Sequence, residues 1–82
     1  MNYKFSIIEI NKEKYRIKAT IENSYKEVIF DDEFWITYNF LDRMPLLPLE
    51  YFKQGIPNGS IRGEFIFYLK KYINSVVNPA TK

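Results

Sequence analysis

Apolar and polar residues alternate along the N-terminal part of the chain with the period of two that is typical of β-strands. Residues 15–21 (YRIKATI) follow this pattern without exception, so one face of the strand is apolar and the other is polar. Residues 3–10 (YKFSIIEI) form a strand that is apolar on both faces. The polar residues 11–14 (NKEK) join the two strands as a four-residue loop, so the chain is predicted to start with a β-hairpin.

A third strand is predicted over residues 25–30 (YKEVIF), after a turn at residues 22–24 and before Asp31 and Asp32, which we expect to close it. The next segment, residues 34–40 (FWITYNF), is compatible with a helix capped by Asp31 or with a strand. We interpret it as a strand, because its β-branched and aromatic residues complete an alternating apolar set.

An amphipathic helix is predicted over residues 61–76, where large apolar side chains recur three and four positions apart. Ser60 is its expected N-cap residue, and Asn78 with Pro79 is expected to end it. The apolar stripe consists of Ile61, Phe65, Tyr68, Leu69, Tyr72, Ile73 and Val76.

The segment before this helix is predicted to be a connector, because Pro45 and Pro48 cannot donate ladder hydrogen bonds and break helices. It contains a short helical turn with Pro48 near its N1 position and Gly55 as its C′ residue. The expected fold is α+β, an antiparallel meander of three or four strands with the C-terminal amphipathic helix packed on one face. We expect a single domain over residues 1–78 and a frayed tail at residues 79–82.

The composition excludes most catalytic chemistry. The 82 residues include no histidine and no cysteine, which removes the commonest general base, the thiol nucleophile and the imidazole and thiolate metal ligands. We therefore expect no enzyme activity, no metal and no cofactor. The absence of disulfides fits a cytoplasmic protein, and no apolar run approaches the roughly 20 residues needed to span a membrane.

Large aromatic and apolar residues are more numerous than one small core is expected to bury. We expect some of them at the surface or in an interface, where tryptophan and tyrosine are favoured anchors. Alternatively, the domain uses bulky side chains to fill its own core. The residues concerned are Trp35, Tyr38, Phe40, Tyr51, Phe52 and Phe67, together with the second apolar face of the first strand.

Charge is unevenly distributed, with +3 over residues 1–26, −5 over residues 27–50 and +4 over residues 51–82, for a net charge of +2. The acidic residues Asp31, Asp32 and Glu33 precede Trp35. We interpret these four residues as the binding surface for a protein with a basic face. The alternatives for the three acids are a solvated turn or a magnesium site.

A basic group, Lys12, Lys14, Arg16 and Lys18, is the alternative candidate site and would contact nucleic acid. On a strand, Tyr15 faces away from Arg16 and Lys18, so it cannot form a base-stacking platform with them. The same lysines are explained by a solvated strand face, where they also discourage pairing at an edge.

The sequence therefore favours a non-catalytic protein-binding module, in the form of a small bacterial or phage inhibitor or immunity-type protein. A nucleic-acid-binding accessory domain is the second hypothesis. A homodimer through the spare apolar face of the first strand is compatible with the same pattern.

Overall fold

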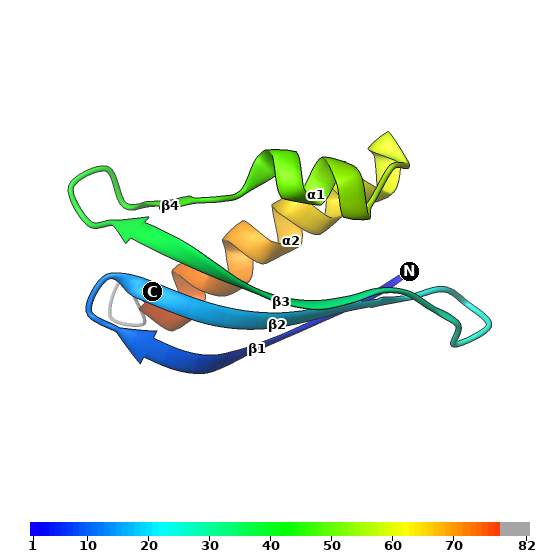
Figure 1. Cartoon of the computed structure of the whole chain (residues 1–82), viewed down its shortest axis with the longest axis horizontal. Coiled ribbons are helices and arrows are strands. Elements are labelled where there is room, and N and C mark those ends of the chain that lie inside the picture. Colours follow the sequence, from blue (N-terminus) through cyan, green and yellow to red (C-terminus); the bar gives the residue numbers. More distant parts are fainter. Residues whose placement is uncertain (78–82) are drawn as a thin grey trace.

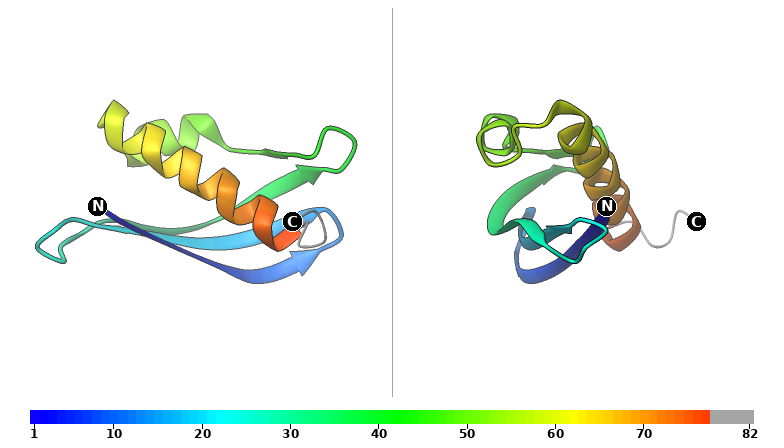
Figure 2. Two further views of the ribbon diagram at one scale, coloured as in Figure 1. Left: turned by 180° about the vertical axis from the view of Figure 1, so that it is seen from behind. Right: turned by 90° about the vertical axis from the view of Figure 1, so that its right-hand side faces the viewer.

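The computed structural model describes residues 1–77 and shows a four-stranded antiparallel sheet in the order β1-β2-β3-β4. Both helices lie on the same side of β1, β2 and β3 (Figure 1), and α2 runs diagonally across these strands (Figure 2). The α+β meander with a C-terminal helix packed on one face is confirmed. The elements are β1 (Asn2–Asn11), β2 (Lys14–Glu22), β3 (Val28–Asn39), β4 (Met44–Leu46), α1 (Leu49–Gly55) and α2 (Gly59–Val77).

The first hairpin has a two-residue loop, Lys12 and Glu13, where a four-residue loop was predicted. Asn11 and Lys14 pair with each other, so they extend the strands, and Lys12 takes a left-handed conformation with φ 59°. The register of β1 against β2 shifts between Ile7 and Glu9, which marks a β-bulge at the residue between them.

The third strand does not close at Asp31 and Asp32, as the sequence had suggested, but runs through them as the middle of β3. The prediction of a strand after the acids is confirmed as far as Asn39, within this one longer strand. In the register with β2, Asp31 lies opposite Thr20 and Glu33 opposite Lys18. Because alternate residues of a strand face opposite sides, these two acids reach solvent without breaking the ladder.

The fourth strand contains Pro45, in a segment that was predicted to be a connector without ladder pairing. Pro45 lies opposite Tyr38, and the backbone N–H of Tyr38 donates to the carbonyl of Glu13 at 2.8 Å, on the β2 side. In an antiparallel ladder, Tyr38 and Pro45 therefore form a non-hydrogen-bonded pair, and the proline nitrogen faces the outer edge of the sheet. The short edge strand tolerates proline for this reason.

The α2 helix is capped by Asn58 and not by Ser60. The Oδ1 atom of Asn58 accepts the backbone N–H groups of Ser60 and Ile61 at 3.0 and 3.1 Å, the geometry of an N-cap. The helix begins at Gly59, so Ser60 already lies inside its first turn. The predicted end at Asn78 and Pro79, and the tail at residues 79–82, lie outside the described residues.

Gly55 is the last residue of α1, and it is not the left-handed C′ residue that was expected. No glycine has a positive φ, and Ile56 takes the C-cap position. A Cβ atom on Gly55 would lie 2.8 Å from Cε1 of Phe30, so glycine is needed here for close helix-to-strand approach. At its other end α1 has Pro48 as N-cap, one position before the predicted N1.

The core lies between the inner face of the sheet and the two helices. From α2 it contains Phe65, Leu69 and Ile73, all fully buried, whereas Tyr68 and Val76 at the margin of the predicted stripe are exposed. Of the surplus aromatics, Tyr38 and Phe52 are buried, while Trp35, Phe40, Tyr51 and Phe67 are exposed. The remaining buried side chains are Tyr15, Ile17, Ala19, Ile21, Phe30, Phe34, Ile36, Pro45 and Ile56.

Candidate functional site

The face of the sheet opposite the helices is not covered by any element among residues 1–77 (Figure 2), and we call it the open face. Most residues of both predicted sites lie on it, on the neighbouring strands β2 and β3, whereas Lys12 is in the hairpin loop and Asp32 points to the helix side. Trp35 of β3 is opposite Arg16 of β2, and Glu33 is opposite Lys18. The acidic–aromatic segment and the basic strand, which sequence analysis treated as alternatives, therefore form one surface of mixed charge.

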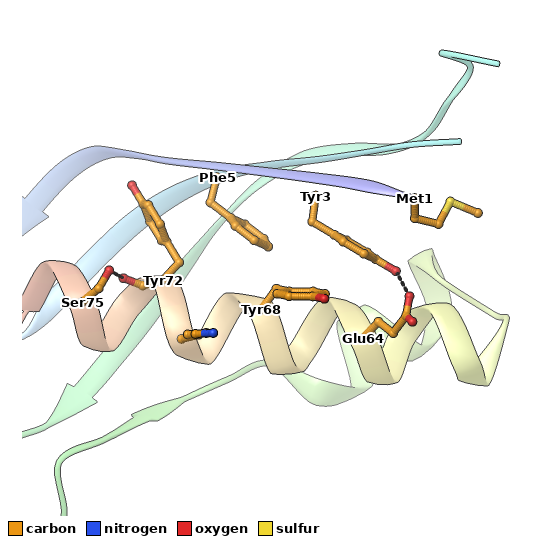
Figure 3. A pocket seen from close by; sticks show the side chains of 8 residues that line it. Met1, Tyr3, Phe5, Glu64, Tyr68, Tyr72 and Ser75 are labelled. Carbon is orange, nitrogen blue, oxygen red and sulfur yellow. Dashed lines mark hydrogen bonds between the residues drawn. The ribbon is translucent and has the colours of Figure 1, made fainter. Parts of the chain in front are cut away.

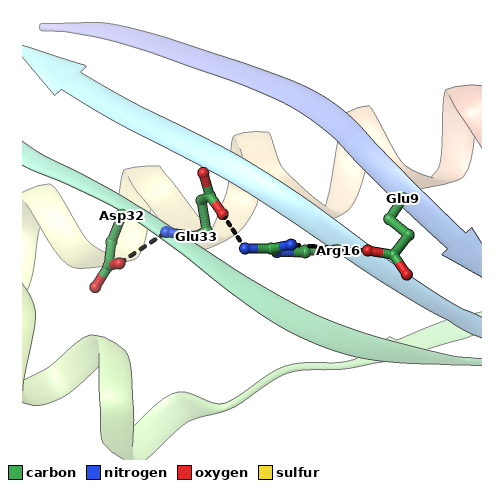
Figure 4. Close-up of polar contacts among 4 residues, drawn as sticks. All are labelled: Glu9, Arg16, Asp32 and Glu33. Atoms are coloured by element: carbon green, nitrogen blue, oxygen red, sulfur yellow. Dashed lines mark hydrogen bonds and ion pairs between the residues drawn. The ribbon is translucent and has the colours of Figure 1, made fainter.

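Arg16 lies at the centre of the charges on this face. Its guanidinium group contacts Glu33 on β3 and lies 3.7 Å from Oε1 of Glu9 on β1 (Figure 4). A second ion pair joins Nζ of Lys4 to Oε1 of Glu22 at 3.1 Å. These pairs are solvent-exposed and contribute little to stability, and the pair between Arg16 and Glu33 engages one residue of each predicted site.

Asp32 pairs with Ala19 in the register, so its side chain lies on the opposite side of the sheet from those of Asp31 and Glu33. Its Oδ1 atom accepts the backbone N–H of Glu33 at 2.8 Å (Figure 4). Adjacent acids on a strand point to opposite sides, so the three carboxylates do not converge. Within residues 1–77, no group of three acidic side chains is placed to hold a metal ion.

The basic candidates are similarly dispersed. Lys12 is in the hairpin loop. Lys14 and Lys18 are on β2, two positions before and two positions after Arg16, which is engaged in ion pairs. Tyr15 is buried on the inner face, as the alternation predicted, and is unavailable for base stacking. An aromatic platform beside free cations, the usual basis of single-stranded nucleic-acid binding, is missing from the described part of β2.

Trp35 is the large aromatic side chain of the open face, and 44% of its surface is exposed. It lines a shallow hollow of about 370 Å³ together with Asn11, Lys14 and Thr37. Its ring thus offers apolar area next to amide, ammonium and hydroxyl groups. This combination suits the centre of a protein interface, where tryptophan contributes large apolar contacts within a polar rim.

A second concave surface, which we call the tyrosine groove, lies between β1 and α2 (Figure 3) and has a volume of about 610 Å³. The Tyr3 ring lies 5.2 Å from the Tyr68 ring, and the Tyr3 hydroxyl donates to Oε1 of Glu64 at 2.7 Å. Burial and this hydrogen bond raise the pKa of the Tyr3 hydroxyl above its ordinary value. The groove is lined by Met1, Tyr3, Phe5, Glu64, Tyr68, Lys71, Tyr72 and Ser75.

Local sequence patterns do not predict this groove, because its two walls are far apart in the chain: the bonded residues Tyr3 and Glu64 are separated by 61 positions. The exposed apolar loop between β3 and β4 was also not predicted. Leu41 in that loop is 96% exposed, while the Oδ1 atom of Asn39 accepts the N–H groups of Leu41 and Asp42 and holds the loop in place. An apolar residue inside a turn was the available signal for this loop.

No helix within residues 1–77 is long and apolar enough to cross a membrane. Comparison of the chain with family models, with curated proteins and with solved structures finds no match.

Proposed function

We propose that the chain is a non-catalytic protein-binding module that binds another protein through its open face, with Trp35 as the apolar anchor. The supporting observation is the position of Trp35, half-exposed in the middle of a strand on the open face, which no helix within residues 1–77 covers. A tryptophan that contributes to neither the core nor a turn offers its apolar area to a partner.

The charges around Trp35 support the same proposal. Arg16 lies directly opposite it, and Glu33 and Lys18 follow on the two strands. Aromatic and arginine side chains dominate the energetic centres of protein interfaces, and surrounding polar groups exclude water and set specificity. The partner surface would carry charges of both signs in a complementary arrangement. This replaces the uniformly basic partner surface that Asp31, Asp32 and Glu33 alone would suggest.

The small size and the lack of histidine and cysteine favour an inhibitor or immunity-type role in the cytoplasm as the form of this function. The nucleic-acid alternative has less support, because Arg16 is already engaged by Glu9 and Glu33. Salt separates the two hypotheses. Binding to a polyanion weakens steeply and log-linearly with salt, whereas an interface anchored by tryptophan weakens modestly.

Photo-crosslinking in the native host cells tests the proposal. The crosslinking residue benzoylphenylalanine replaces Thr37, which lines the Trp35 hollow, and in a control it replaces Tyr25, an exposed aromatic in the β2–β3 loop. We expect a discrete protein adduct from position 37 that is lost when Trp35→Ser is added, and no such adduct from position 25. Adducts that disappear on nuclease treatment, or that persist in the Trp35→Ser background, would contradict the proposal.

A further inference from the structure

We propose that the chain forms a symmetric dimer in which a second copy covers the tyrosine groove. In this arrangement the free edges of the two β1 strands pair antiparallel, and the two α2 helices lie antiparallel beside each other, about one two-fold axis. The surface is separate from the open face, so this inference is independent of the proposed function.

The exposed side of α2, which includes the groove-lining residues Glu64, Tyr68 and Lys71, has a pattern that is complementary to itself when reversed. From one end it presents a small residue, an acid, two aromatics, a base and a small residue. In an antiparallel pair of helices centred between the two aromatics, Glu64 of each copy therefore meets Lys71 of the other, as a two-fold interface requires. At the centre, Phe67 is 60% exposed and Tyr68 is 44% exposed. The full series is Ser60, Glu64, Phe67, Tyr68, Lys71 and Ser75.

The edge of β1 offers unpaired backbone next to this helix. Among the described residues, β2 is the strand neighbour of β1, and the outer edge of β1 has none. The bond from Tyr38 N–H to the Glu13 carbonyl shows that odd-numbered residues of β2 direct their backbone groups to β3. The even-numbered residues of β2 therefore bond to β1, where their partners include Lys4 and Ser6. The alternate residues Tyr3, Phe5 and Ile7 direct their N–H and C=O groups to the outer edge.

The centre of the α2 pattern and the centre of the β1 edge lie next to each other. The register shift after Ile7 limits regular pairing to Asn2–Ile7, and Lys4 is next to the middle of that segment. Lys4 also lies between Tyr3 and Phe5, and each of these two side chains contacts α2 on both sides of the midpoint of the pattern, so one two-fold axis serves both strand and helix. These contacts join Tyr3 to Glu64 and Tyr68, and Phe5 to Phe65 and Tyr72.

A second copy fits the groove, because reversal of the same sequence brings each acid opposite a base. The axis brings the two Lys4 side chains opposite each other, where like charges would repel. Each Lys4 is neutralised within its own copy by Glu22 at 3.1 Å, which removes this objection. The dimer would bury the exposed rings of Phe67 and Tyr68 and would join the two open faces into one continuous surface.

Sedimentation equilibrium with charge-reversal variants tests the dimer. Lys71→Glu and Glu64→Lys should each raise the dimer dissociation constant on the order of ten-fold, since each creates two like-charge contacts across the axis. The double variant restores both pairs and should return to within a few-fold of the original value. Lys70→Glu is the matched control, because it changes the same charge at an exposed position off the groove side, and it should leave the dimer intact.

A chain that stays monomeric up to millimolar concentration overturns the proposal, and so does a double variant no better than the single ones. Hydrogen exchange provides a check that does not depend on variant folding. The amides of Tyr3 and Phe5 should exchange more slowly as concentration rises, whereas those of Lys4 and Ser6, already bonded to β2, should not change. A dimer without this alternation, or one abolished by Trp35→Ser, would use another surface and would contradict the inference.

Discussion

The two faces of the sheet are made by the same strands and differ in burial. On β2, Ile17 and Ala19 are fully buried against the helices, while their neighbours Arg16 and Lys18 stand on the open face among exposed ion pairs. Burial of apolar area stabilises the fold, and exposed ion pairs contribute little to it. The inner face is therefore where substitutions should change stability, and the open face is where they should change binding.

The largest effect on stability is expected from truncation of the inner core. Leu69 is fully buried in the middle of α2, and Leu69→Ala should lower the free energy of unfolding by about 2–5 kcal/mol through cavity formation. Urea denaturation measures this loss. Lys70→Ala, at the next and exposed position, is the control and should change stability by less than about 0.5 kcal/mol. A similar loss from both variants would show that Leu69 is not on the buried side of α2 and Lys70 on its exposed side.

A smaller effect is expected where α1 meets the inner face. Gly55→Ala places a methyl group 2.8 Å from Phe30 and should destabilise the protein by about 1–3 kcal/mol through overpacking. Gly63→Ala in α2 is the matched control, because its Cβ would have no neighbour within 4 Å. It should stabilise the helix by about 0.5–1 kcal/mol. A lower melting temperature for Gly55→Ala and a higher one for Gly63→Ala would support the close contact between α1 and Phe30. An unchanged melting temperature for Gly55→Ala would refute it.

The smallest effect on stability is expected from the three exposed acids of β3, of which Asp31 and Glu33 lie on the open face. Replacing Asp31 and Asp32 by asparagine and Glu33 by glutamine should change the free energy of unfolding by less than about 1 kcal/mol, because the acids are exposed. The same variant should associate more slowly with a partner that presents cations to this face, most clearly at low salt. Chemical denaturation and stopped-flow association measure the two quantities. A loss of stability comparable to that of Leu69→Ala would remove the distinction between the faces.

Local periodicity was sufficient for the elements that have one apolar and one polar side. The strict alternation in β2 correctly placed Tyr15 inside, and the spacing in α2 identified Phe65 and Leu69 as core. Turn and breaker preferences were less reliable. Asp31 and Asp32 favour turns in isolation, yet here they continue a strand whose register with β2 places Asp31 in solvent.

The sequence by itself determined the α+β class, the first two strands and the C-terminal helix, and the lack of histidine and cysteine side chains, because these depend on composition and on spacing within one element. Only the tertiary structure decided that the acidic and basic segments adjoin on one face, that Arg16 joins Glu9 to Glu33, and that Tyr3 meets Glu64 across the groove. Such pairings depend on strand register and on where a helix crosses the sheet. Both are set by packing between distant parts of the chain, which local patterns do not encode.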